Sequence, residues 1–414
     1  MVRQILGYLT FLLIAYFLSE NRGLLKKKWK NILFGVIFQI TLAIALVNIP
    51  SFVNAMEYVA NAVMKLKDAT IEGTKFVFGY IGGGELPFEL KEGSMAFVLA
   101  FQAFPTVIVV SILAAVLTYL KVIPFLANVI GSVFRYIFGI SNNIGMVGAG
   151  KIFLGQFEAA LLIKTKLNSI SKSEMFVVMS MAFSTTSAAL MPVYTTAIYK
   201  VCPEAMTHII MSSIIGVIST FLVCVIMAPP SEQNIFEKQK TSEKPYPNLM
   251  TAISKGSSDG AFVWWAIVGS LIGMVALITI VNYILAAFPN IGAEPITLQR
   301  IFSFIMYPFA WIIGIPEADI SNVAQIIGTK FVLNETIAYF DMVKMALSKD
   351  SITATIYAIT NFGNFACIGM TVGGFIAMAP GRKDIASLGV RSFIAGTIAT
   401  GLTATLMSFF IFEF

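Results

Sequence analysis

Histidine, cysteine and charged residues are all scarce in this chain. Its single histidine, His208, cannot form the histidine pair on which zinc chemistry commonly depends. Its three cysteines lie in apolar surroundings and are too few for a disulfide framework or a metal site. Only 12% of the residues are charged, whereas a soluble domain carries about a quarter. The sequence therefore predicts no metal and no cofactor, and it argues against a soluble protein.

Apolar residues take the place of the missing charge. Of the 414 residues 57% are hydrophobic, and the mean hydropathy is +0.83. This composition is typical of a multi-pass membrane protein with short loops. The net charge of +6 comes from basic residues in short loops between apolar runs, which indicates membrane topology and not nucleic-acid binding. We expect the lipid bilayer, and no nucleic acid, as a partner.

The apolar runs predict an all-α polytopic membrane protein with about eight transmembrane helices, because about 20 apolar residues span a bilayer. Segments 142–168 and 298–345 are interrupted by glycine, proline and charge, so we expect two re-entrant helical hairpins there. Segments 52–92 and 122–141 are expected to include interfacial helices. The predicted spans are 4–19, 31–50, 95–120, 174–197, 207–228, 261–286, 353–378 and 390–412.

Clusters of lysine and arginine indicate the orientation of these segments, since cytoplasmic loops carry an excess of both. With the clusters inside, the first hairpin must begin and end in the cytoplasm and the second hairpin outside. Two hairpin–span–span units then form an inverted repeat, which is typical of secondary transporters. The predicted divisions are a scaffold at 1–141, a first transport repeat at 142–228, a linker and scaffold span at 229–297, and a second transport repeat at 298–414.

Carboxylates interrupt apolar stretches in both halves of the chain. Gln156 and Glu158 lie near the tip of the first hairpin, and Asn334 and Glu335 lie in the second. A carboxylate inside a membrane costs several kcal/mol unless it faces a cavity or a partner, so it predicts a functional site. We therefore expect a polar site held between the two halves.

Two further amides, Asn361 and Asn364, flank Gly363 in the seventh predicted span. This combination favours local unwinding, which would free backbone groups for a ligand. Amides and carboxylates together suit a polyhydroxylated small molecule that carries a base. Alternatively, the polar groups pair with one another and hold helices together, which is less costly for amides than for the two glutamates.

Several motifs give the chain its resemblance to a known family. It resembles the concentrative nucleoside transporters nearly end to end, and the order of Gly-Gln-x-Glu before Asn-Glu-x-x-Ala-Tyr is specific. The resemblance implies a homotrimer in the bacterial plasma membrane that imports nucleosides by cation-coupled alternating access. The motifs are Gly73-Thr-Lys-Phe-Val-Phe-Gly79, Phe153-Leu-Gly-Gln-Phe-Glu158, Gly328-Thr-Lys-Phe-Val-Leu-Asn-Glu335 and Phe362-Gly-Asn-Phe-Ala-Cys-Ile-Gly369.

By matching position, the resemblance implies that Gln156 and Glu158 address the base and that Glu335 and Asn364 hold the ribose hydroxyls. Phe362 matches an aromatic residue beside the sugar, although a packing role for it is equally open. The residues expected to bind substrate are Gln156, Phe157, Glu158, Asn334, Glu335, Phe362, Asn364 and Cys367.

Two of these residues depart from the family pattern. Phe157 stands where a small hydroxyl residue is usual, and it adds bulk and stacking surface. Cys367 stands where serine is usual, and its weaker hydrogen bonding is expected to lower ribose affinity by about 1 kcal/mol. Another polar heterocyclic solute therefore stays open as the substrate.

Lys151 is the sharpest departure from the family pattern. The resemblance implies that sodium-coupled members have an asparagine at this position, which ligates the sodium ion. Thr185 matches a hydroxyl ligand of the same ion. An ammonium cannot ligate Na⁺, and two cations repel strongly at low dielectric. We therefore expect Lys151 to occupy the sodium place and coupling to be to protons rather than sodium. Alternatively, Lys151 reaches the cytoplasmic interface and has no role.

An intramembrane enzyme is the competing class. The sequence argues against it, because it holds no zinc-type histidine pair, no Gly-x-Ser-x-Gly elbow and no acidic metal cluster. The sequence predicts a transporter and no catalytic residues.

Overall fold

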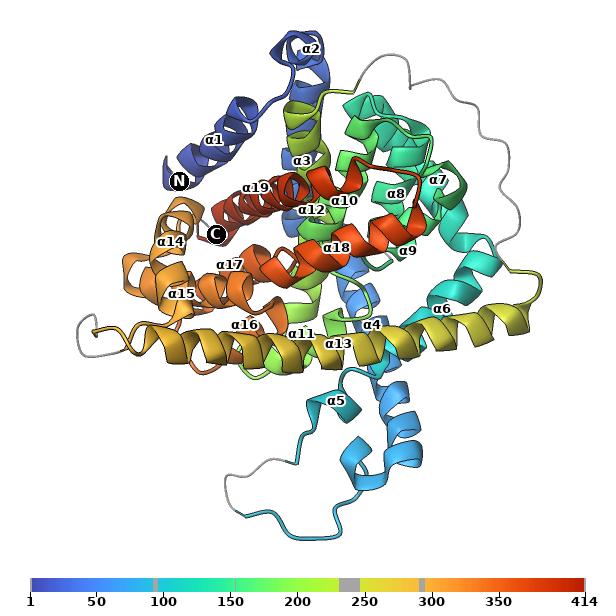
Figure 1. Cartoon of the computed structure of the whole chain (residues 1–414), viewed down its shortest axis with the longest axis vertical. Helices are drawn as coiled ribbons and strands as arrows, with labels where there is room; N and C mark the ends of the chain where they lie inside the picture. Colours follow the sequence, from blue (N-terminus) through green and yellow to red (C-terminus); the bar gives the residue numbers. More distant parts are fainter. Residues whose placement is uncertain (1, 92–95, 153, 231–245, 290–294, 413–414) are drawn as a thin grey trace.

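The computed structural model describes residues 2–91, 96–152, 154–230, 246–289 and 295–412, and within these ranges it contains helices and no strand (Figure 1). This confirms the all-α fold expected from the sequence. Residue 153 of the first hairpin motif and most of the predicted linker lie outside the described residues.

In the described part of the chain, five helical segments are long and apolar enough to cross a membrane, and the bent pair α7–α8 would make a sixth. The first predicted span is a shorter apolar helix, α1 (Val2–Phe17). After the second predicted span comes α4 (Pro50–Phe78). This single 29-residue helix takes up most of segment 52–92, where interfacial helices were expected. The five are α3 (Trp29–Asn48), Leu99–Tyr119 with α5 (Leu99–Gln102) and α6 (Thr106–Tyr119), α12 (Ala205–Met227), α13 (Leu249–Leu285) and α19 (Ile385–Ile411).

Two series of helices repeat the same order of elements. Each series opens with a helix that ends at a glycine in the left-handed region, Gly139 (φ 61°) after α7 (Val122–Phe138) and Gly314 (φ 99°) after α14 (Leu298–Ile313). A helical hairpin follows in both series. The hairpins are α8 (Asn142–Lys151) with α9 (Glu158–Leu161), and α15 (Glu317–Val332) with α16 (Glu335–Met342).

The segment 298–345 therefore contains one helix more than the expected hairpin. Gly314 ends α14, and Pro316 directly precedes α15, where its fixed φ suits a helix start. In the first series the corresponding bend between α7 and α8 is 119°. α7 and α14 are thus equivalent lead-in helices, and α8 and α15 are the first arms of the two hairpins.

A broken span follows each hairpin. The expected single span 174–197 was wrong, because the segment forms two helices with a break between them. They are α10 (Lys172–Ser184) and α11 (Met191–Ile198). The break begins in a run of serine and threonine, whose hydroxyls compete for backbone groups, and Pro192 opens the second half. α17 (Lys349–Ile359) and α18 (Phe365–Met378) are separated at Thr360–Asn364, which confirms the expected unwinding at Gly363.

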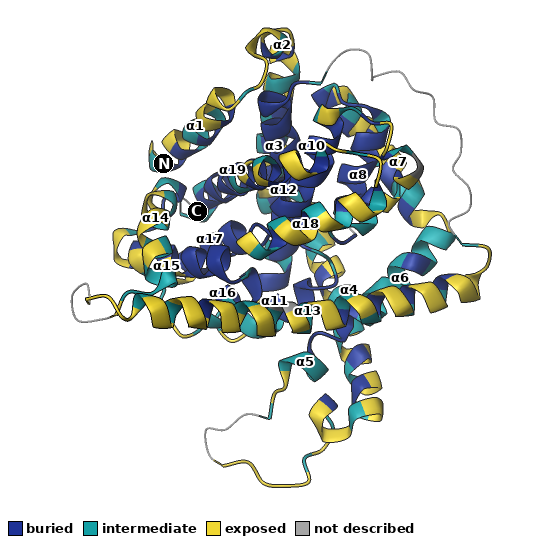
Figure 2. Cartoon of the chain, in the orientation of Figure 1, coloured by how far each residue is buried: buried dark blue, intermediate teal, exposed yellow. Residues whose placement is uncertain are grey.

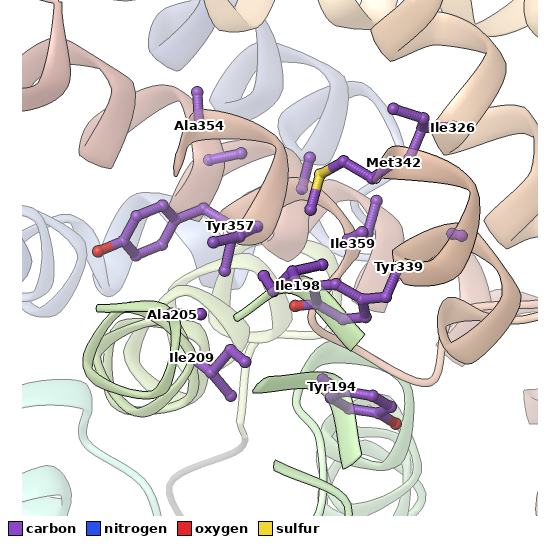
Figure 3. Close-up of a cluster of buried hydrophobic side chains, with 14 of the residues drawn as sticks. Tyr194, Ile198, Ala205, Ile209, Ile326, Tyr339, Met342, Ala354, Tyr357 and Ile359 are labelled. Atoms are coloured by element: carbon purple, nitrogen blue, oxygen red, sulfur yellow. The ribbon is translucent and has the colours of Figure 1, made fainter. Parts of the chain in front are cut away.

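α12 and α19 form the buried centre, with α1 and α3 packed against them, whereas α13 lies along the outside on α6 and exposes much of its length (Figure 2). Helices of both repeats meet in one cluster of buried hydrophobic side chains (Figure 3). There the rings of Tyr194 on α11 and Tyr339 on α16 stack with centroids 4.9 Å apart. The short remaining helices are α2 (Arg22–Lys27), η1 (Gly79–Gly82) and η2 (Lys164–Lys166).

Candidate functional site

The end of the second hairpin presents a buried carboxylate. Glu335 is the first residue of α16 and is 4% exposed. Its Oε1 accepts a hydrogen bond from the Tyr194 hydroxyl (2.8 Å), and its Oε2 accepts one from Asn364 Nδ2 (3.3 Å). The positive end of a helix also favours a carboxylate in the first turn. Glu335 is therefore held from three sides by α11, α16 and α18.

Two asparagines cap the helices α16 and α18, which begin next to this carboxylate. Asn364 Oδ1 accepts a hydrogen bond from Cys367 N (2.9 Å) and so starts α18. Asn334 Oδ1 accepts one from Ile337 N (3.0 Å) and so starts α16. Asparagine is among the preferred N-cap residues because its short side chain reaches these free amides. The capping role of Asn334 was not expected, and its contact with substrate stays a prediction.

The tip of the first hairpin is more open. Gln156 lies in the turn between α8 and α9, Glu158 is the first residue of α9, and both are half-buried. Gln156 Nε2 donates to the Thr371 hydroxyl of α18 (2.5 Å). Glu158 Oε2 accepts a hydrogen bond from Phe157 N (3.2 Å) and lies over Gly155, where a Cβ would collide with the carboxylate. The side-chain amide of Gln156 thus fixes the hairpin tip to α18, whereas the Glu158 carboxylate stays bonded to the backbone of the tip itself.

Phe157 packs against α18. Its ring lies edge-on to Phe375, with centroids 5.8 Å apart, and a Cβ on Gly374 would stand 2.5 Å from the ring. The expected stacking surface is therefore partly covered by a helix, and Gly374 is the residue that makes room for it.

One face of α18 joins the two hairpin ends. Asn364, Cys367 and Thr371 share this face because residues three and four apart on a helix are neighbours. Asn364 meets the second hairpin and Thr371 meets the first. At 1.5 Å of rise per residue these two positions lie about 10 Å apart. Cys367 lies between them and is 6% exposed.

Lys151 is the last residue of α8, 1% exposed, and its Nζ has no hydrogen-bond partner among the described residues. The ammonium lies 5.4 Å from the ring centre of Phe362 in the α17–α18 break, and the nearby charge that acts on it is that of Glu158. Phe362 therefore faces a cation. Thr185 follows α10, and its hydroxyl donates to Met181 O (3.4 Å), so no hydrogen bond joins it to Lys151.

Three residues of this site were missed in the sequence. Thr371 is a single hydroxyl within an apolar stretch and Tyr194 is followed by two threonines, and nothing local marks their partners, which are 215 and 141 residues away. Lys330 is 1% exposed and electrostatically coupled to Glu335. Its signal was available, because Lys-x-x-Leu precedes the turn of both hairpins.

The repeated hairpins, the broken spans and the polar groups between them define a multi-pass membrane transporter and not an enzyme. Comparison with known families extends this. Residues 208–408 match the family described as Na⁺ dependent nucleoside transporter C-terminus, and residues 6–81 match its N-terminus. Residues 100–200 match a family described as nucleoside recognition. The chain belongs to the concentrative nucleoside transporter family and is a cell-membrane protein.

Relatives cover nearly the whole chain. An uncharacterized transporter of Haemophilus influenzae is 29% identical over 99% of this chain and 97% of its own length. The putative nucleoside permease NupX of Escherichia coli is 27% identical over 99% of both chains. Solute carrier family 28 member 3 of Mus musculus is 28% identical over 97% of this chain and 57% of its own length.

Solved structures of CNTnw share the fold. The inward-facing substrate-bound state gives a TM-score of 0.86 at 26% identity and covers 99% of this chain and 97% of its own. A variant in an outward-facing state gives 0.87, also at 26% identity, with 99% and 98% covered.

Proposed function

We propose that the chain imports nucleosides by alternating access, with the sugar at the Glu335 end of α18 and the base at the Gln156 end. The observation that carries this proposal is the shared face of α18, on which Asn364 and Thr371 receive the two hairpins about 10 Å apart. Such a spacing suits a base joined to a sugar. The named inward- and outward-facing states of CNTnw support the same mechanism.

The two ends offer different chemistry. An ionised carboxylate accepts hydrogen bonds only, so Glu335 suits two neighbouring sugar hydroxyls. The amide of Gln156 can both donate and accept, which suits the mixed edge of a base. The hydrogen bond between Gln156 and Thr371 must open when a base enters, and the base must replace it.

Coupling to protons is the second part of the proposal. Lys151 is a buried, tethered cation beside Glu158 and Phe362, and among the residues that the structure describes its Nζ has no hydrogen-bond partner. An ammonium at the sodium place opposes entry of a second cation. Lys151 then carries the coupling proton, at the place that Na⁺ occupies in a sodium-coupled member.

The test is uridine uptake into proteoliposomes under an imposed pH gradient or Na⁺ gradient. Wild type should respond to the pH gradient alone, and Lys151→Asn should lose that response. Lys65→Asn, on the exposed side of α4, is the matched control and should behave as wild type. Uptake that requires Na⁺ and is indifferent to Lys151→Asn would contradict proton coupling.

A different polar heterocycle is the alternative substrate, and Phe157 is the observation that favours it. Its ring fills space beside Gly374 at the base end of the site. Competition of labelled uridine by nucleosides and by free heterocyclic bases separates the two. Competition by bases alone would favour the alternative.

The homotrimer that the family resemblance implies is also a proposal, and the outer face of α13 is a surface that could take part in it. That face exposes large apolar side chains over several turns, as a subunit interface or a lipid contact requires. Native mass spectrometry of the detergent-solubilised protein should show three copies, and a monomer would contradict this. The exposed side chains are Phe262, Trp265, Ile272, Leu277, Ile280 and Ile284.

A further inference from the structure

The two hairpins carry matching lysine–glutamate pairs. Lys151 ends α8 and Lys330 lies in the last turn of α15, so each closes the first arm of its hairpin. Glu158 and Glu335 each open the second arm, and each acts electrostatically on the lysine of its own hairpin. Both lysines also border the break between α17 and α18. The matching segments are Lys151-Ile-Phe-Leu154 and Lys330-Phe-Val-Leu333.

The surroundings of the two ammonium groups differ. A Cβ built on Gly363 would lie 3.0 Å from Lys330 Nζ, 2.8 Å from Asn361 Oδ1 and 3.3 Å from Phe183 O. The Lys330 ammonium, an amide oxygen and a backbone carbonyl therefore gather where Gly363 has no side chain. Phe183 lies in the last turn of α10, where the unpaired carbonyls form the negative end of the helix.

The Lys330 ammonium thus lies near an amide oxygen and a carbonyl oxygen, whereas the Lys151 ammonium has no hydrogen-bond partner among the described residues. We propose that Lys330 is a positioning residue, whose positive charge holds Glu335 ionised and oriented for the sugar hydroxyls. This rests on the proposed nucleoside transport. It gives the two equivalent lysines different tasks, one at the sugar end of the site and one at the coupling end.

The physical reason lies in the burial of Glu335. The hydrogen bonds that Glu335 receives from Tyr194 and Asn364 come from neutral groups. A buried carboxylate without a positive partner tends to take up a proton, and it then no longer accepts with both oxygens. Removing one member of a buried pair is costly, while removing both together is often tolerated.

A double-mutant cycle tests the pairing. Affinities for uridine and for 2′,3′-dideoxyuridine are measured for wild type, Lys330→Met, Glu335→Gln and the double variant. Lys330→Met should weaken uridine binding by roughly a hundredfold, the scale of one unpaired buried charge, and leave dideoxyuridine nearly unchanged. The double variant should bind uridine no more weakly than Glu335→Gln. Losses that add, or an equal loss for dideoxyuridine, would overturn the proposal.

Thermal unfolding in detergent keeps the test decisive if Lys330→Met folds poorly. Recovery of the unfolding temperature in the double variant supports the pairing, and no recovery overturns it. Lys65→Met is the matched control at an exposed position. A wild type that takes up no nucleoside contradicts the proposed function, whereas the thermal cycle reports on the pairing alone.

Discussion

The two hairpin ends hold their polar groups with very different firmness. At the second hairpin Glu335 is buried, accepts two hydrogen bonds from distant helices and interacts electrostatically with Lys330. At the first hairpin Gln156 and Glu158 are half-buried, and Glu158 is bonded to the backbone of its own turn. One end of the site is preorganised and the other is adaptable.

This difference assigns separate tasks to the two ends. Preorganised groups bind without first losing conformational freedom, so the sugar end should supply most of the affinity. Half-buried side chains can exchange partners at little cost, so the base end should set selectivity. The assignment would be wrong if substitutions at the sugar end changed mainly selectivity and substitutions at the base end changed mainly affinity.

The largest effect is expected from Glu335→Gln. The change removes a buried, hydrogen-bonded charge and leaves Lys330 without its partner, so uridine uptake efficiency should fall by roughly a hundredfold or more. Initial uptake rates over a range of uridine concentrations measure this. Glu85→Gln, in an exposed loop, is the control and should behave as wild type. A fall of only a few-fold would contradict a preorganised sugar end.

Gly155→Ala should act next most strongly, at the adaptable end. Its new Cβ would collide with the Glu158 carboxylate and push this side chain away from Phe157 N, a local overpacking that should lower uptake several-fold. Gly373→Ala on α18 meets nothing within 4 Å and should have no effect. If both variants transport equally well, the position of Glu158 does not matter.

Phe157→Ala should change selectivity more than rate. The ring packs beside Gly374 and Phe375, so its loss frees space at the base end. We expect the ratio of purine to pyrimidine nucleoside uptake to change several-fold, within the scale of a packing loss. The preference for uridine over dideoxyuridine should stay as in wild type, and a change in that preference would place Phe157 at the sugar instead.

Cys367→Ser should give the smallest effect, and a gain. A hydroxyl bonds the sugar better than a thiol, so uridine should bind about fivefold more tightly, the scale of one hydrogen bond. Competition assays against labelled uridine measure this, with dideoxyuridine as the unaffected control. Weaker uridine binding by the variant would show that the thiol of Cys367 only packs.

The sequence predicted the parts of the fold and site that have a local signature. Acids within apolar segments marked Glu158 and Glu335, and Gly363 between two asparagines marked the break between α17 and α18. The nearly uncharged segment 174–197 was read as one span, although its run of hydroxyl residues and Pro192 could have revealed the break between α10 and α11.

Pairings across the fold were beyond local reading. The bond from Tyr194 to Glu335 joins two half-helices of different repeats, and only tertiary packing brings them together. Asn334 was assigned to substrate from its neighbour, whereas its oxygen starts α16. Lys330 could have been found by comparing the two hairpins with each other, because it stands where Lys151 stands in the first.

A structure of the protein with bound uridine tests the account most directly. The account predicts the ribose hydroxyls within hydrogen-bond distance of Glu335 and Asn364, and the uracil ring beside Gln156, along the face of α18 that also carries Thr371. A uridine bound in the reverse direction, or away from this face, would contradict it.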